Sequence, residues 1–351
     1  MFGIDLRTLK IVWTVSLFAL AVLLIYLVGG TIVVFALAVF LAHLLGPLAE
    51  RVEAMIPTPH IKKSVSLAVV YGAILLIIAI AMIPVISLVG SQAAALAGQL
   101  PTTLEGDPLA RLKLPVWLEP ARERLTAVLH DRLDDFNANL IPMLQDVGSS
   151  MASFLGSLLA LLLVPILSFF FLQDSKEIHD AIVDIVPGDY RELTEDILAD
   201  LHRLLVQYIQ ALVILGIIVF LSFSLIFYLM GVQNPVLLAS VAGLMEVIPV
   251  VGPLVSGGII LVVALLTGYG HLGWLAVFLI AFRLVQDYGI NPHLMSSGAA
   301  IHPLLVLFGV LAGEQVAGIP GMFFSVPIIA GLRIIVVRMR RKSITKDVLI
   351  E

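Results

Sequence analysis

Two apolar stretches in the C-terminal half of the chain are too long for one membrane-spanning helix and are interrupted near their middle. They cover residues 235–267 and 301–338, and as helices they would be about 50 and 57 Å long against a hydrocarbon core of about 30 Å. Prolines, glycines and one carboxylate interrupt each of them, in EVIPVVGP (246–253) and GEQVAGIPGMFFSVP (313–327). Non-helical backbone is tolerated at membrane depth only inside protein or beside a water-filled cavity. The breaks therefore indicate a transporter.

The rest of the chain is also rich in apolar segments of membrane length. Of the 351 residues, 60% are hydrophobic and 13% are charged, whereas an ordinary soluble domain is about a quarter charged. The sequence predicts an all-α membrane protein with about eight transmembrane segments, two of them broken or re-entrant helical hairpins. The first segment is too long for a cleaved signal peptide, so we expect it to be retained. Uninterrupted spans are expected at residues 11–29, 31–49, 64–89, 151–173, 206–230 and 272–290.

Basic residues indicate how the chain is oriented in the membrane. They gather at the start, in the short loop at residues 50–63 and at the C-terminal end, and short cytoplasmic segments carry such an excess. We therefore expect both termini to be cytoplasmic. The predicted parts are N-terminal membrane helices (1–89), an external amphipathic helical domain (90–150), a transmembrane helix (151–173), a cytoplasmic helical segment (174–205), a C-terminal transport core (206–340) and a cytoplasmic tail (341–351).

Two of these parts are polar enough to lie outside the bilayer. In the external domain, apolar residues from Leu125 to Val147 recur at spacings of three and four, which is typical of an amphipathic helix. This helix either packs on its own domain or forms a contact between subunits. Residues 174–205 carry nine acidic residues against three basic ones, and we interpret them as a solvated helical hairpin.

Four ionisable residues fall within the predicted spans, where a charge costs about 2.5 to 3.5 kcal/mol. Arg283 and Asp287 are four positions apart on one helix, with Gln286 beside them, so they can pair. Glu246 and Glu314 have no opposite charge nearby in sequence, and half-helix ends at such breaks bind polar solutes or cations. Either each carboxyl group takes part in transport, or it stays protonated and hydrogen-bonds to a neighbouring helix. Both follow a proline by 11 residues (Pro235, Pro303), through an internal repeat or by coincidence.

Several classes of function are excluded. With no cysteine and a net charge of −5, the chain offers no thiol chemistry and no general basic surface for nucleic acid. The eight histidines form no pair at metal-ligand spacing, so a metal site would have to be assembled from remote positions, and we expect His43 and His302 to hydrogen-bond between helices. We therefore expect no catalytic, cofactor or metal site and no enzyme activity.

Several motifs resemble those of the AI-2E family of bacterial transporters, the autoinducer-2 exporter-like permeases. They are LAHLLGPLAERVE, PILSFFFLQD, LLVQYIQALVILGI, GLMEVIPVVGPLVSG, LVQDYGINPHLM and the long run from IHPLL to IIAGL. The resemblance covers nearly the whole chain apart from residues 90–150. The sequence departs from the family pattern at His43, where a smaller polar residue is expected, and in VQDYGINP, where an acidic residue and a glycine often precede the asparagine.

The resemblance implies a multi-pass carrier of the bacterial inner membrane that assembles as a homo-oligomer, a pentamer. Family members are linked to export of the quorum-sensing molecule autoinducer-2 and, in other branches, to sodium or lithium/proton antiport. The positions that match the family motifs are Glu246, Pro249, Gly252, Gln286, Pro292, His302, Pro303, Gly313, Gly318, Gly321 and Pro327.

These observations predict a secondary transporter that exports a small polar solute, with autoinducer-2 as the candidate, coupled to protons through Glu246 or Glu314. A Na⁺(Li⁺)/H⁺ antiporter is the first alternative, and a non-transporting scaffold whose segment 174–205 recruits a partner is the second. The partners expected in either transport case are the lipid bilayer and a small polar solute or a monovalent cation. The predicted transport site consists of Glu246, Pro249, Gly252, Arg283, Gln286, Asp287, His302, Glu314, Gly318, Pro320 and Gly321.

Overall fold

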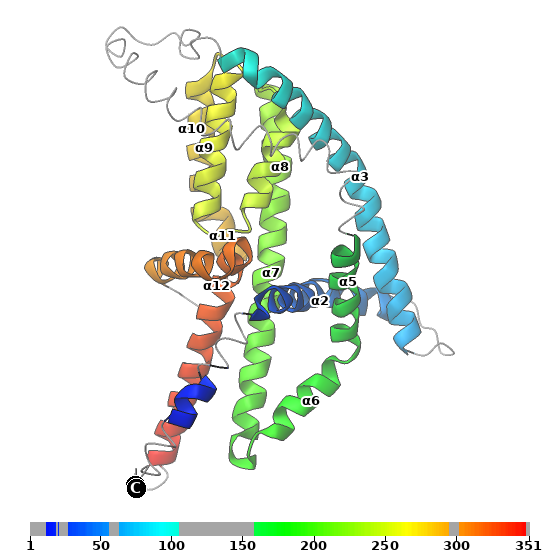
Figure 1. The fold of residues 1–351 in the computed structure, drawn as a ribbon, viewed down its shortest axis with the longest axis vertical. Helices are drawn as coiled ribbons and strands as arrows, with labels where there is room; N and C mark the ends of the chain where they lie inside the picture. The colour runs from blue at the N-terminus through cyan, green and yellow to red at the C-terminus, as the bar shows by residue number, and fades with distance from the viewer. Residues whose placement is uncertain are drawn as a thin grey trace, which may run out of the picture.

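A computed structural model describes residues 12–18, 20, 27–55, 63–104, 158–294 and 302–348. Within these ranges every regular element is a helix (Figure 1), which confirms the all-α class for the described part of the chain. The elements are α2 (Gly29–Met55), α3 (Lys63–Leu104), α5 (Leu158–Gln173), α6 (Ser175–Ile185), α7 (Gly188–Met230), α8 (Pro235–Met245), α9 (Val251–Leu266), α10 (Leu272–Val285), the π-helix η2 (Gln286–Ile290), α11 (Asn291–Leu294) and α12 (Pro303–Val348).

The described residues include five helical segments long and apolar enough to cross a membrane. Large apolar side chains of α3 such as Val69, Ile77 and Ile83 are 66%, 67% and 58% exposed, which suits a helix that faces lipid. About eight segments were predicted, and the described part supplies these five together with three shorter apolar helices at 163–173, 235–245 and 251–266. The five long candidates are Gly29–Ala49, Leu67–Gln99, Gly188–Met230, Leu272–Leu294 and Pro303–Lys342.

The 43-residue helix α7 is the central helix of the fold. Figure 1 shows α8 alongside it and α2 crossing near its middle. Its apolar C-terminal half packs against α10 through aromatic rings, with Phe223 and Phe282 centroids 4.9 Å apart. Its contact with α8 is closer still, because Gly216 and Gly243 meet without side chains between the two backbones. Small residues allow this close approach between helices in a membrane.

Helices α8 and α9 form a hairpin whose two open ends lie together at the C-terminal end of α7. The Tyr269 hydroxyl donates to the Met230 carbonyl at 3.0 Å, and the Gln233 amide donates to the Thr267 carbonyl at 3.3 Å. The side chain of Gln92 on α3 accepts the Leu237 N–H at 2.8 Å. It thereby satisfies one of the N–H groups that the first turn of α8 leaves without a helical partner.

Helix α12 is interrupted inside its length and turns back on itself. Ala317 and Gly318 have non-helical backbone angles, and Gly318 adopts φ 59° and ψ −139°, a conformation available to glycine. Beyond this turn Gly321 lies directly against Gly313, and Ser325 and Ile329 face Gly309. The two halves of α12 therefore pack on each other as antiparallel neighbours close to the turn.

Polar contacts join the second half of α12 to the first half of α7. Arg338 pairs with Asp196 at 2.8 Å and with Asp200 at 2.7 Å. Lys342 donates to the Asp189 carbonyl and lies 4.4 Å from the centroid of the Tyr190 ring. Several of the acidic residues of segment 174–205 thus have partners within the chain.

The structure describes helices in parts of both polar segments. Helix α3 ends at Leu104 and so includes residues 90–104, the first part of the predicted external helical domain. The predicted segment 174–205 divides at Pro187 into α6 and the start of α7, in line with the helical hairpin predicted for it. The amphipathic helix at 125–147 and the start of the span at 151–173 lie outside the described residues.

The Gly216–Gly243 contact leads to a stability prediction. A Cβ at position 243 would lie 2.9 Å from the Gly216 carbonyl oxygen, so Gly243→Ala should force α7 and α8 apart at a cost of about 1 to 3 kcal/mol. Gly98→Ala on α3 is the matched control, since nothing lies within 4 Å of its Cβ and alanine favours the helix. Melting temperatures of the purified variants should fall for Gly243→Ala only, and equal values would contradict the packing.

Candidate functional site

The tip of the α8–α9 hairpin is a tight, strained turn at residues 246–250. The Val251 N–H donates to the Pro249 carbonyl at 2.7 Å, which makes Val250 the central residue of a γ-turn. Val250 has φ 66° and ψ −52°, and this form of the γ-turn is rare and strained for a β-branched residue. Gly252 lies so close to the Met245 carbonyl that no side chain fits there. The turn therefore depends on Pro249 and Gly252, as EVIPVVGP suggested.

Glu246 occupies the start of this turn and is held inside the protein. Its residue exposure is 6%, and that of Gln286 is 2%. The Gln286 Nε2 group donates to Glu246 Oε2 at 2.8 Å. The carboxyl group thus has a direct partner at the end of α10. These two side chains are 40 positions apart, and no sequence pattern predicts that they meet.

Gln286 begins the π-helix η2, a local widening of the helix with a clear cause. Pro292 cannot donate a hydrogen bond and its ring conflicts with the carbonyl four positions earlier. The Asn291 N–H donates instead to the carbonyl of Gln286, five positions back. Such π-helical turns are frequent at functional sites.

Arg283 and Asp287 lie on either side of Gln286 and form the predicted pair. Their Nε and Oδ2 atoms are 2.8 Å apart, and the two side chains are 36% and 38% exposed. The second carboxylate oxygen of Asp287 accepts from the Asn291 amide at 3.2 Å. Because the pair is partly exposed, its contribution to stability is small, about 0 to 1 kcal/mol.

A cavity of about 470 Å³ opens between α7, α8, α9 and α10 beside these groups. Its polar lining comes from Glu246, Gln286, Arg283 and Ser256, and the remaining walls are largely apolar. A few convergent polar groups in an apolar cavity are typical of a small-molecule site. The combination of acceptor, amide and guanidinium suits a small solute that carries hydroxyl or carbonyl groups.

The predicted site residues on α12 do not line this cavity. Glu314 is exposed and accepts from the side chain of its neighbour Gln315 at 3.0 Å. The His302 Nδ1 atom accepts the Leu304 N–H at 3.2 Å and so caps the first turn of α12. Gly318, Pro320 and Gly321 form the turn and fold-back of α12.

The two broken segments nevertheless meet against the same part of α7. Tyr208 donates its hydroxyl to the Phe323 carbonyl at 3.1 Å, just after the turn of α12. Val247, next to Glu246, packs into the same apolar cluster as Tyr208 and Phe323. The two broken segments therefore share one apolar cluster on α7.

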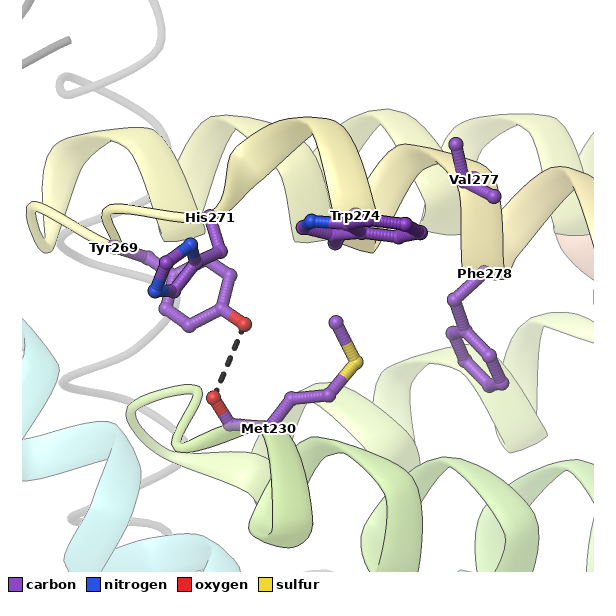
Figure 2. A pocket seen from close by; sticks show the side chains of 6 residues that line it. All are labelled: Met230, Tyr269, His271, Trp274, Val277 and Phe278. Atoms are coloured by element: carbon purple, nitrogen blue, oxygen red, sulfur yellow. Dashed lines mark hydrogen bonds between the residues drawn. The ribbon is translucent and has the colours of Figure 1, made fainter. Parts of the chain in front are cut away.

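A second hollow lies at the open end of the hairpin, as Figure 2 shows. Its side chains are Met230, Tyr269, His271, Trp274, Val277 and Phe278. The Tyr269 hydroxyl already donates to Met230, and Trp274 is 70% exposed. Trp and Tyr side chains near a helix end are typical of the membrane–water interface, so we interpret this groove as a membrane boundary and not as a transport site.

Four contributors to this region carried no sequence signal strong enough to predict them. Ser256 is 3% exposed and looks like any small residue of an apolar helix. A β-branched residue such as Val250 is not expected at positive φ. Tyr208 and Gln92 make their contacts with segments that are distant in sequence.

Comparison with known proteins shows what this chain is similar to. Residues 15–341 match the family described as AI-2E family transporter. A Methanothermobacter thermautotrophicus protein named "Putative transport protein" is 26% identical over 283 residues, which are 78% of each chain.

Two shorter matches point in the same direction. "Putative transport protein YrrI" of Bacillus subtilis is 22% identical over 178 residues, 51% of this chain and 50% of the relative. "Putative permease PerM" of Escherichia coli K12 is 29% identical over 185 residues, 51% of this chain and 52% of the relative. In these two cases the chain spans about half the length of the curated relative that it matches.

The contact at Gly252 gives a prediction for the hairpin tip. Gly252→Ala places a Cβ against the Met245 carbonyl, so the turn must open and we expect a loss of about 3 kcal/mol in stability. Gly257→Ala in the same helix has nothing within 4 Å of its Cβ and should be neutral or slightly stabilising. Melting temperatures of both purified variants check this, and a Gly252→Ala protein as stable as its control would disprove the close contact.

The strain at Val250 gives a prediction of opposite sign. Glycine adopts positive φ without the Cβ clash, so Val250→Gly should stabilise the turn by about 1 kcal/mol. The side chain of Val250 is 40% exposed, so little packing is lost. Val255→Gly, at a comparably exposed helical position (46%), should instead destabilise the protein by about 1 kcal/mol. A lower melting temperature for Val250→Gly would contradict the strained turn.

Proposed function

Because the chain belongs to the AI-2E family of transporters, we propose that it is a secondary transporter that exports a small polar solute through the cavity beside Glu246. Autoinducer-2, a polar molecule rich in hydroxyl groups, is the candidate substrate. Export is coupled to protons through Glu246. The relatives named as transport proteins and permeases support the general class of function, and the substrate and the coupling ion are our proposal.

One observation carries this proposal. A carboxyl group with 6% exposure lies at the non-helical tip of a hairpin, accepts from the buried Gln286 amide and lines a cavity of about 470 Å³. Broken helices that meet in this way provide the binding sites of many secondary transporters. Because only a few polar groups line the cavity, a bound solute is small and makes hydrogen bonds through only some of its polar groups.

Proton coupling follows from the cost of a charge at this position. An ionised carboxylate in hydrocarbon costs about 2.5 to 3.5 kcal/mol, so a proton that neutralises Glu246 is bound when the polar solute is absent. When a solute hydroxyl group donates a hydrogen bond to the ionised carboxylate, it offsets part of the cost of that charge, and the proton can leave. Competition between proton and solute for Glu246 then couples the two fluxes.

A Na⁺(Li⁺)/H⁺ antiporter is the second candidate, and one feature favours it. The Glu246 carboxylate lies beside the non-helical backbone of residues 246–250, and carboxylate and freed carbonyl oxygens are the ligands that Na⁺ uses at such breaks. The scaffold hypothesis has less support, since Asp196 and Asp200 of the acidic segment bind Arg338 within the chain.

We also propose a topology in which the α8–α9 hairpin and the folded-back α12 are re-entrant within an eight-segment membrane domain. The contacts Tyr269–Met230 and Gln233–Thr267 at the open end of the first hairpin support entry and exit on one side. Both termini are cytoplasmic, residues 90–150 contribute an external domain, and the protein is a homo-oligomer, a pentamer, in the bacterial inner membrane. The charge distribution and the family membership support these features.

Transport by purified protein in proteoliposomes tests the function. Interior pH is recorded under an imposed proton gradient while autoinducer-2, Na⁺ and Li⁺ are added in turn. We expect a response to autoinducer-2 that Glu246→Gln reduces at least about tenfold, because an amide cannot bind the coupled proton. Glu314→Gln is the matched control, since Glu314 is exposed outside the cavity, and it should keep most of the rate.

The other outcomes decide between the alternatives. A response to Na⁺ or Li⁺ that disappears in Glu246→Gln would replace export by cation antiport. Equal rates in Glu246→Gln and the wild type would remove Glu246 from the mechanism. The two proteins should have equal melting temperatures, because glutamine has the shape of glutamate and can still accept from Gln286.

A further inference from the structure

A second cavity, separate from the one at Glu246, collects three histidines from three helices. It has a volume of about 450 Å³ and lies between α2, α5, α6 and α7. His43 comes from α2, His179 from α6 and His202 from α7, and the hydroxyl group of Ser175 lies on the same wall. Apart from these four side chains the lining is apolar and includes no carboxylate or amine. Imidazole is therefore the chemistry that this cavity offers.

His43 and His202 face each other inside this cavity. Their ring centroids are 5.0 Å apart and the rings are tilted by 47°. Two imidazoles that share one ion at about 2.1 Å from each nitrogen have centroids about 4.5 to 5.3 Å apart, for coordination angles of about 90° to 110°. The observed separation of 5.0 Å falls within this interval.

The orientation of His43 is fixed in the way that metal-binding histidines usually are. Its Nδ1 atom lies 2.7 Å from the Val39 carbonyl oxygen. A carbonyl can only accept, so Nδ1 carries the proton and donates it. This tautomer leaves Nε2 with a free lone pair, and a backbone carbonyl in this role is a common outer partner of a ligating histidine.

We propose that His43 and His202 bind one divalent first-row transition-metal ion of the Zn²⁺ type, which links α2 to α7. Nitrogen ligands select such ions over Mg²⁺ and Ca²⁺, which prefer oxygen. In the described residues no group of three or more His, Cys, Asp or Glu side chains is arranged to hold an ion. The remaining coordination positions therefore belong to water, or to His179 after a rotation of its side chain.

The ion has a route of entry and a structural consequence. His202 is exposed and His43 is half-buried, so solvent reaches the pair from the α7 side. The ion binds the folded state, in which α2 packs on α7, more strongly than states in which these helices are apart. It therefore stabilises the packing of α2 on α7.

Metal binding to the full-length protein in detergent, freed of any histidine tag, tests the proposal. Titration calorimetry with Zn²⁺ and Ni²⁺ at pH 7.5 should show one site per chain, and Mg²⁺ should show none. His43→Gln and His202→Gln should each weaken Zn²⁺ binding at least about tenfold. His271→Gln, in the separate groove near the C-terminal end of α7 (Figure 2), is the matched control and should bind as the wild type does.

A second measurement keeps the test valid if a variant is less stable. Zn²⁺ should raise the melting temperature of the wild type and of His271→Gln, but not that of the double variant His43→Gln/His202→Gln. Equal Zn²⁺ binding in all variants, or no binding to the wild type, would overturn the site and leave aromatic packing as the reason for the 5.0 Å separation.

Discussion

The requirement that backbone N–H and C=O groups find partners within the protein governs this fold, because a lipid interior offers none. It explains why the described elements are helices and why specific contacts satisfy backbone groups at several of the breaks. Gln92 accepts an N–H group from the first turn of α8. The γ-turn at Val250 and the π-turn that ends at Asn291 bind backbone groups that the broken helices would otherwise leave free. The candidate site exists because these closures leave Glu246 facing Gln286.

Local sequence was sufficient to predict the helical class and the two breaks at residues 246–253 and 313–327, since prolines, glycines and apolar length act within a few residues. It was also sufficient for Arg283 and Asp287, which share one helix face. Local sequence could not predict the pairing of Glu246 with Gln286, because only the packing of the hairpin tip on the end of α10 brings them together. The same holds for His43 and His202, which are remote in sequence and come together only through the packing of α2 on α7.

The two broken segments start alike and differ in geometry. Each begins with a proline, and in each a glutamate follows 11 residues later. In the first segment that glutamate is the first residue of the break, because Pro249 and Gly252 close the turn immediately after it. In the second, Gly318 makes the turn beyond Glu314, which leaves that carboxylate exposed. Burial distinguishes two glutamates that sequence context could not rank.

Site-directed labelling of its ends shows whether the α8–α9 hairpin is re-entrant, and it is straightforward because the chain has no cysteine of its own. Gln233→Cys and His271→Cys, both at exposed positions, flank the α8–α9 hairpin. A membrane-impermeant maleimide is applied to each face of sealed vesicles of known orientation. A re-entrant hairpin with Glu246 at its tip predicts that both cysteines react from the same face. Reaction from opposite faces would mean that the segment crosses the membrane once, and would contradict the account of the transport site given above.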